Sequence, residues 1–372
     1  MIYFDSAATT FQKPPTVRKA VLHAMQTMSS PGRGSYPHAE AAEEMLFHCR
    51  SLASELFGLS SPEQVAFTMN ATHALNIAIK TLVEPGGRVA VSGYEHNAVT
   101  RPLHALDAEV VVADAPLFDQ EEIVRGFARA IESGAKTVIC THVSNVFGYI
   151  LPIEAIAALC REANVPLVVD ASQSAGILPL DMRQLGAAFI AMPGHKGLYG
   201  PQGTGLLLCS HEVEPLIEGG TGSESLMQAM PDFLPDRLEA GTHNVSGIAG
   251  LDAGLEFIKS TGIDRIRRHE QILLKKTVRH LEKIPDITFW RAKDPALQTG
   301  VLSFCVKGKS SFDVSEALAR HGIAVRAGLH CAPFAHRTVG TLPDGTVRLS
   351  FSAYSRAEEV DAFARTLRRI AR

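Results

Sequence analysis

Short apolar runs alternate with longer amphipathic segments between residues 64 and 209. Apolar runs bounded by polar or glycine-rich stretches predict buried strands, and apolar positions spaced by three and four predict helices. The predicted strands are 64–69, 88–92, 109–113, 136–143, 166–169, 189–192 and 205–209, and the predicted helices among them are 71–83, 119–132 and 153–163. Strands that are apolar along their whole length are typical of parallel sheets covered on both faces. The pattern therefore predicts an α/β fold with a mostly parallel seven-stranded sheet.

Outside this region the apolar pattern changes. Two helices are predicted before the alternation, at 17–25 and 39–57. After residue 245 the pattern predicts long helices at 246–259 and 264–283, short strands at 287–291, 300–306, 323–326 and 347–351, and a final helix near the end of the chain. We therefore expect an N-terminal segment (1–15) that packs with the small domain, a large domain (16–245), and a small α+β domain (246–372).

Composition narrows the class of protein. The chain has 372 residues, of which 46% are hydrophobic, and a formal net charge of -3. A near-neutral chain without a basic run is not typical of nucleic-acid-binding proteins. The first residues lack the basic and apolar regions of a signal peptide, and no apolar stretch is long enough to span a membrane. The six cysteines are scattered without a Cys-x-x-Cys pair. We therefore expect a cytoplasmic protein without a disulfide framework.

Candidate chemistry follows the ends of the predicted strands, where ligands bind in parallel sheets. Lys196 lies in a stretch rich in glycine and proline directly after the strand at 189–192. A lysine desolvated there would have a lowered pKa and a nucleophilic amine, as a Schiff base to pyridoxal phosphate (PLP) requires. Taken alone, the stretch is more typical of a surface lysine in a glycine-rich loop. Asp170 follows another apolar run and would pair with a protonated pyridine nitrogen, or cap the segment after it.

Three further strand ends carry polar residues. Asn70 is a good N-cap, and the free N–H groups of the helix after it suit a phosphate. His96 would lie flat on a planar cofactor, although a surface histidine is as common. Asn145 would donate to a phenolate oxygen or close a turn. No Gly-x-Gly-x-x-Gly follows the first of these strands, which disfavours a nicotinamide-binding dehydrogenase.

Together and in this order, these residues give the chain a strong likeness to a known family. It resembles the class V, fold-type I PLP enzymes, specifically the cysteine desulfurase and selenocysteine lyase group. The matching motifs include Tyr-Phe-Asp-Ser-Ala-Ala-Thr-Thr at 3–10, Glu-His at 95–96, Ser-Asn-Val at 144–146, Asp-Ala-Ser-Gln at 170–173, Gly-His-Lys at 194–196, Arg-Leu-Glu-Ala-Gly-Thr at 237–242, Arg-Ala-Gly-Leu-His-Cys-Ala at 326–332 and Arg-Leu-Ser at 348–350. The short spacing from the cysteine to Arg348 resembles the type II members, which have a compact loop.

The resemblance implies a role for each matching residue. Lys196 would carry PLP, with His96 stacked on its ring, Asp170 on the pyridine nitrogen and Gln173 on the ring oxygen. Asn145 would contact the cofactor oxygen or the substrate carboxylate. The residues implied at the phosphate are Ala71, Thr72 and His195, joined by Thr242 from the second subunit of a homodimer. Those implied at the substrate carboxylate are Arg348, as a bidentate partner, with Arg326 and Arg33.

Cys331 selects one reaction within the family. In desulfurases a cysteine of this loop attacks the sulfur of the substrate, which here would convert L-cysteine to L-alanine and leave a persulfide on Cys331. A buried structural thiol is the plain alternative. A zinc site of His330, Cys331 and His336 is not expected, because two of these residues are adjacent and a fourth ligand is not evident.

Several related functions stay open on the sequence alone. One is a selenocysteine lyase, because sulfur and selenium differ too little to be distinguished by residue types. Another class V aminotransferase or lyase would not need Cys331. A third alternative is a non-catalytic PLP-binding carrier of sulfur or selenium. Since compact-loop members commonly rely on a partner, the resemblance also implies a sulfur-acceptor protein.

Overall fold

The computed structural model describes residues 1–32 and 34–371 of the chain. At its centre lies a seven-stranded sheet with the strand order β2-β8-β7-β6-β5-β3-β4. Its strands are β2 (Val65–Thr68), β3 (Arg88–Ser92), β4 (Glu109–Ala113), β5 (Thr137–Thr141), β6 (Leu167–Asp170), β7 (Phe189–Pro193) and β8 (Gly205–Cys209). The neighbouring pairs from β7 to β4 are parallel, and β8 runs antiparallel to β2 and β7. The predicted α/β fold with a mostly parallel sheet is confirmed.

Successive side chains of the central strands pack on opposite faces of the sheet. Val168 belongs to the same apolar cluster as Leu75 of α3, whereas Val169 belongs to the cluster of Phe127 of α5. Both faces are therefore covered, as expected for strands that are apolar along their whole length. The helices that follow the strands of this sheet are α3 (Ala71–Leu82), α4 (Asn97–Ala105), α5 (Gln120–Glu132), α6 (Ile153–Ala163) and α7 (Met182–Leu185).

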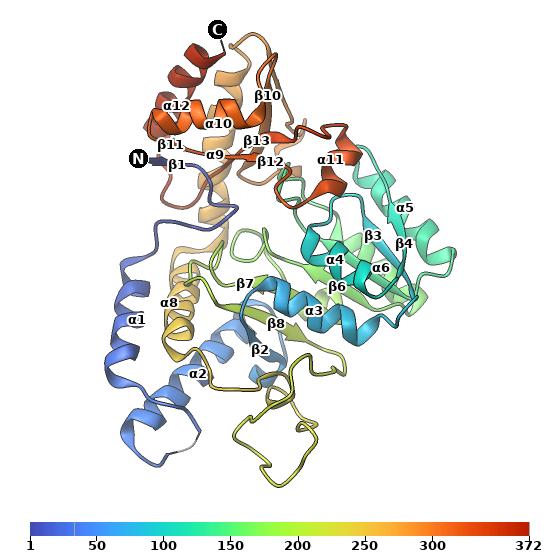
Figure 1. Cartoon of the computed structure of the whole chain (residues 1–372), viewed down its shortest axis with the longest axis vertical. Coiled ribbons are helices and arrows are strands. Elements are labelled where there is room, and N and C mark those ends of the chain that lie inside the picture. The colour runs from blue at the N-terminus through green and yellow to red at the C-terminus, as the bar shows by residue number, and fades with distance from the viewer. Residues whose placement is uncertain (33, 372) are drawn as a thin grey trace.

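Three long helices pack together beside this sheet (Figure 1). They are α1 (Pro15–Thr27), α2 (Pro37–Leu56) and α8 (Val245–Thr261), and α8 contacts both of the others. Gly250 permits this packing, because a Cβ there would lie 2.6 Å from Pro201 Cγ and 2.7 Å from Val21 Cγ2. The helix that opens the predicted small domain thus packs on helices of the predicted large domain. The division at residues 245 and 246 stays a prediction.

A smaller α+β region follows and includes the N-terminus. Its antiparallel sheet has the order β12-β13-β10-β9, and a two-stranded parallel sheet pairs β1 with β11. A third apolar cluster joins Phe4 to this region. The strands are β1 (Ile2–Tyr3), β9 (Ile287–Phe289), β10 (Val301–Val306), β11 (Ile323–Ala324), β12 (Arg326–Gly328) and β13 (Thr346–Ser350), and the helices are α9 (Ile263–Leu281), α10 (Ser311–Arg320), α11 (Pro333–Val339) and α12 (Ala357–Ile370).

The structure corrects the sequence expectation at a few places. The single strand expected at 323–326 is two strands, β11 and β12, which join different sheets. Helices α4, α7, α10 and α11 were not expected. Short 3-10 turns also occur at Pro62–Gln64, Asp236–Leu238 and Pro295–Leu297. Within residues 1–32 and 34–371, none of the helices combines the length and the apolar character needed to cross a membrane.

Candidate active site

A cavity of about 480 Å³ lies at the carboxyl ends of β5, β6 and β7. This is the edge at which parallel sheets bind ligands. Its lining includes nine residues that the sequence analysis singled out. These are Ala71, Thr72, His96, Asn145, Asp170, Gln173, His195 and Lys196, with the N-cap residue Asn70.

Lys196 follows β7 between two glycines that the backbone requires. A Cβ at Gly194 would lie 2.1 Å from Thr204 Oγ1, and a Cβ at Gly197 would lie 2.3 Å from the Ala175 carbonyl oxygen. The chain therefore runs against its neighbours on both sides of the lysine, as the glycine pattern predicted. Burial lowers the pKa of Lys196 to about 8, against the opposing effect of Asp170. The fraction of the amine that is neutral and nucleophilic near neutral pH is consequently much larger than for an ordinary lysine.

Asp170 and His96 are fixed by hydrogen bonds to the backbone. Asp170 ends β6, is buried, and accepts a bond of 2.9 Å at Oδ1 from the Ser172 N–H. His96 caps α4, with Nδ1 accepting a 3.0 Å bond from the Ala98 N–H. Burial lowers the pKa of His96 to about 4. The imidazole is therefore neutral, and its proton is on Nε2.

The far end of the cavity is suited to an anion. Helix α3 begins at Ala71, and its N-cap Asn70 accepts a 2.9 Å bond from the His73 N–H. The N–H groups of the first turn carry the positive end of the helix dipole. His195 Nδ1 is buried and has no hydrogen-bond partner among the described residues. An unpartnered ring nitrogen beside a helix N-terminus fits a phosphate, so the residues present fit PLP.

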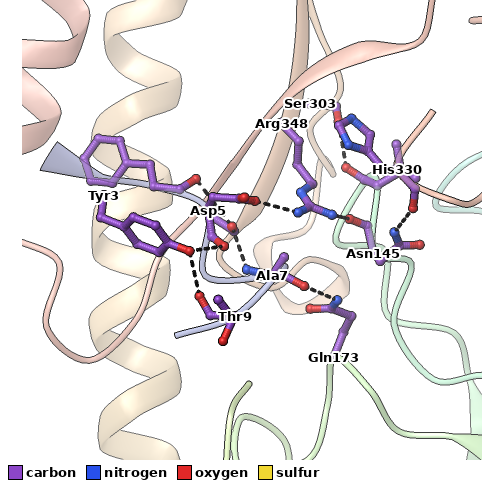
Figure 2. A network of polar contacts seen from close by, with 12 residues as sticks. Tyr3, Asp5, Ala7, Thr9, Asn145, Gln173, Ser303, His330 and Arg348 are labelled. Carbon is purple, nitrogen blue, oxygen red and sulfur yellow. Dashed lines mark hydrogen bonds and ion pairs between the residues drawn. The ribbon is translucent and has the colours of Figure 1, made fainter. Parts of the chain in front are cut away.

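Gln173 and Arg348 connect the cavity to the N-terminal segment (Figure 2). Gln173 Nε2 donates a 3.0 Å bond to the Ala7 carbonyl oxygen. Arg348, buried in β13, pairs through Nη2 with Asp5 Oδ1 at 2.8 Å and donates through Nη1 to the Asn145 carbonyl oxygen at 2.9 Å. Its Nε has no partner within the described part of the chain. The predicted carboxylate-binding arginine thus already faces one carboxylate, from a residue that the sequence did not single out.

The cysteine loop is fastened at two consecutive carbonyl groups. Asn145 Nδ2 donates a 2.8 Å bond to the His330 carbonyl oxygen, and the Asn97 N–H donates a 2.7 Å bond to that of Cys331. Both loop residues have left-handed backbone angles, with φ of 49° and 57°. Cys331 is exposed, whereas Cys49, Cys140, Cys160 and Cys209 are buried. The loop is therefore held beside Asn145, which lines the lysine cavity, and its thiol is exposed.

Two more of the predicted residues do not line this cavity, and a third is not among the described residues. Thr242 is exposed and lines a separate cavity of about 630 Å³ with His73. Its role toward a second subunit stays a prediction. Arg326 is exposed and pairs in register with Arg348 across β12 and β13. Arg33 falls outside the described residues.

Two residues of the site were missed. Asp5 begins the small polar stretch at the N-terminus, and that stretch is the only signal that points to it. Asn97 acts through its backbone N–H, so no side-chain pattern could have revealed it.

Comparison with known proteins agrees with this geometry. Residues 2–363 match the model of the class V aminotransferase family. A probable cysteine desulfurase of Pyrococcus abyssi is 32% identical over 98% of this chain and 92% of its own length. One of Methanothermobacter thermautotrophicus is 33% identical over 100% and 94%. The apo structure of a cysteine desulfurase from Thermococcus onnurineus superposes with a TM-score of 0.91 at 30% identity, covering 100% of this chain and 94% of that one.

The seven-stranded sheet with a lysine after β7 and an aspartate at the end of β6 is the fold of the fold-type I PLP enzymes. The chain belongs to the class V aminotransferase family, and within it to the cysteine desulfurase group.

Proposed function

We propose that this chain is a PLP-dependent cysteine desulfurase that converts L-cysteine to L-alanine and leaves the sulfur as a persulfide on Cys331. The observation that carries the proposal is the hydrogen bond from Asn145, which lines the Lys196 cavity, to the loop that carries the exposed Cys331. An aminotransferase would have no use for a thiol held in this place. Neither a selenocysteine lyase nor a non-catalytic carrier is favoured by a contact in the structure.

The chain offers a partner for each part of the cofactor. Lys196 would hold it, Asp170 would face the pyridine nitrogen, His96 the ring and Gln173 the ring oxygen. Ala71, Thr72 and His195 would face the phosphate. When bound, PLP supplies an electron sink for the charge left after a proton is removed from the substrate.

Other steps, which are binding of the substrate carboxylate and removal of the α-proton, fall to residues of the chain. Arg348 and Arg326 provide positive charge for the substrate carboxylate, and Asn145 lies beside them. The neutral amine of Lys196 removes the α-proton. His96 keeps a proton on Nε2, directed at the bound groups rather than at the backbone.

Sulfur transfer to Cys331 balances without an external oxidant. The Cys331 thiolate attacks the substrate sulfur, so that an S–S bond forms and the carbon–sulfur bond breaks. The electron pair of that bond remains with the substrate carbon, which takes up a proton and becomes the methyl group of alanine. The persulfide stays on Cys331 until an acceptor removes it.

The exposure of Cys331 supports transfer to a sulfur-acceptor protein. The open position of Thr242 is compatible with a homodimer in which it faces the phosphate site of the partner subunit. Both partners are part of the proposal.

The test is the release of alanine and sulfide from L-cysteine by the PLP-loaded protein with a thiol reductant. We expect Cys331→Ala to lower both products by a factor of about 100 or more. Cys305→Ala is the matched control, because Cys305 is half-buried and its thiol contacts the Gly345 carbonyl oxygen instead. Undiminished alanine release by Cys331→Ala would refute the assignment.

A further inference from the structure

A second cavity lies behind Lys196 and is here called the rear cavity. It has about 390 Å³ of empty space. Lys196, Ser172 and Gln173 line both this cavity and the cofactor cavity, so they separate the two. The other polar residues that line the rear cavity are Ser6, Thr10, Glu270, Thr299 and Ser350, with Tyr199.

Glu270 is the acidic residue of the rear cavity. It lies on α9, its exposed fraction is 5%, and no described residue forms an ion pair or a side-chain hydrogen bond with it. Gly300 makes room for it, because a Cβ there would lie 2.8 Å from Glu270 Oε2. Such a buried carboxyl is costly unless a partner satisfies it.

Water is the partner that fits this cavity. Ser6 Oγ is also buried and has no partner within residues 1–32 and 34–371. Thr299 and Ser350 add hydroxyl groups to the same walls. A buried water needs two to four polar partners and a space of about its own size, and the rear cavity supplies both. Such water would contact both Glu270 and Lys196, which line the same cavity.

The proton affinities of the two groups are matched. Burial raises the pKa of Glu270 to about 8 and lowers the pKa of Lys196 to about 8. Because burial shifts the two pKa values toward each other, neither direction of proton transfer is strongly disfavoured. Tyr199 is the other titratable group that faces the cavity, and burial keeps its pKa far above neutral pH. Outside the cavity, Asp170, Asp5, Arg348 and Arg326 act on the charge of Lys196.

We propose that Glu270 is a positioning residue that acts through Lys196, exchanging protons with its amine through water in the rear cavity. The proton that Lys196 takes from the α-carbon passes through this water to Glu270 when its carboxyl group is ionised. A proton from the same water returns later in the turnover, so no net proton is gained or lost. The proposal rests on the proposed function in one respect only, which is that Lys196 removes the α-proton.

The first test follows a deuterium label from L-cysteine deuterated at the α-carbon to alanine, with the PLP-loaded enzyme in ordinary water. In the wild type, exchange through the rear cavity washes the label out. In Glu270→Gln we expect about threefold more deuterium in alanine, with kcat lowered about tenfold and KM changed less than about twofold. Glu270→Asp keeps the carboxyl and is expected to restore much of the washout. Glu282→Gln, an exposed glutamate at the end of α9, is the matched control and leaves all three unchanged.

The second test does not depend on turnover. The visible absorbance of the resting PLP-loaded protein is titrated with pH, and Glu270→Gln is expected to lower the midpoint by about half a pH unit, because it removes the negative charge that Glu270 gains as it ionises near pH 8. If the wild type makes no alanine, the desulfurase assignment fails while this titration still tests Glu270. Wild-type label retention and an unchanged midpoint in Glu270→Gln would overturn the proposal. A Glu270→Gln variant in which kcat falls but the label and the midpoint do not change would also overturn the proposal, because that result indicates a merely structural role.

Discussion

The two halves of the site are built in different ways. Asp170, Lys196 and His96 stand at the carboxyl edge of one parallel sheet, each directly after a strand or in the turn that follows it. Asp5, Arg348 and Cys331 are brought there by polar contacts across the chain, and the Asp5–Arg348 pair joins residues 343 positions apart. The first half, here called the strand-end half, depends on sheet register. The second, the network half, depends on individual hydrogen bonds.

Because of this difference, the two halves should respond differently to substitutions. Asp170 is aligned with Thr141 of β5 on one side and with Ala191 of β7 on the other, so the whole sheet holds it in place. The cysteine loop is held to the sheet domain by two bonds, from Asn145 and from the Asn97 N–H. A single hydrogen bond contributes only about 1 kcal/mol to stability. Substitutions in the strand-end half should therefore act on chemistry, and those in the network half on geometry.

The largest effect is expected in the strand-end half. Lys196→Ala removes the amine that holds the cofactor and takes the α-proton, so we expect alanine formation from L-cysteine to fall by a factor of about 1,000 or more. The fold should persist, because a partly charged buried side chain is replaced by a small apolar one. Product assays and thermal unfolding measure the two results. An active Lys196→Ala, or an unfolded one, would remove the distinction between the halves.

The next effect concerns the Asp5–Arg348 pair. Asp5→Ala leaves the buried guanidinium without its carboxylate, which we expect to lower the free energy of unfolding by about 3 kcal/mol. KM for L-cysteine should rise about tenfold, because Arg348 loses the contact that orients it. Urea unfolding and steady-state kinetics measure the two changes. The exposed Arg320–Glu316 pair provides a control, since Glu316→Ala should change neither by a measurable amount. A lower KM in Asp5→Ala would instead mean that Asp5 competes with the substrate.

A third prediction isolates one hydrogen bond of the cysteine loop. Asn97→Pro deletes the N–H that donates to the Cys331 carbonyl oxygen, at the first position of α4, where proline is well tolerated. Asn97→Ala keeps that N–H and is the matched control. We expect Asn97→Pro to lower the rate of persulfide formation on Cys331 about fivefold relative to Asn97→Ala, with no change in PLP absorbance. Rapid-quench mass measurement of the protein follows the persulfide. Equal rates in the two variants would show that this bond does not position the thiol.

The same division explains how much could be predicted from sequence. The strand ends were predictable because apolar runs locate the strands, and parallel strands place the residues after them at one edge. The structure accordingly gathers Asp170, His96, Asn145 and Lys196 around one cavity. The network half was not predictable in this way. The side-chain amide of Asn145, predicted to face the cofactor or substrate, donates to the His330 carbonyl oxygen, and nothing in the local sequence indicates that partner.

Other limits of the sequence are equally physical. Arg348 was predicted from its motif, but its pairing with Asp5 depends on β1 lying beside β11, a contact between the two ends of the chain. The helix at Ser311–Arg320 was missed although Ser310 caps it, because the segment is short and its apolar positions are few. The rear cavity has no sequence signal, since a lone glutamate in a long amphipathic helix is more often exposed than buried.

The last prediction distinguishes Glu270 from Lys196, at the two ends of the rear cavity, by the sign of the pH dependence of stability. The pKa of Glu270 is raised from its unfolded value to about 8, so between pH 4.5 and 8 the folded protein binds a proton that the unfolded chain does not. The contribution of Glu270 to the free energy of unfolding is therefore largest below this interval and is lost as the pH rises through it. Glu270→Gln lacks this group, so its free energy of unfolding should rise relative to that of the wild type by about 4 kcal/mol between pH 5 and about pH 8.5.

Lys196 has the opposite sign, because its pKa is lowered from 10.5 to about 8. The unfolded chain then binds the extra proton, and stability rises with pH between 8 and 10.5. Lys196→Met should flatten that rise while leaving the lower interval unchanged. Urea unfolding of wild type, Glu270→Gln, Lys196→Met and the control Glu282→Gln, across both intervals, measures the slopes. Opposite slopes of the free energy of unfolding against pH are expected only if both groups are buried and each differs in charge between the folded and the unfolded protein. The shared cavity implies both conditions. Parallel curves for all four proteins would mean that the rear cavity is solvated like the surface, and the water link between its two ends would lose its basis.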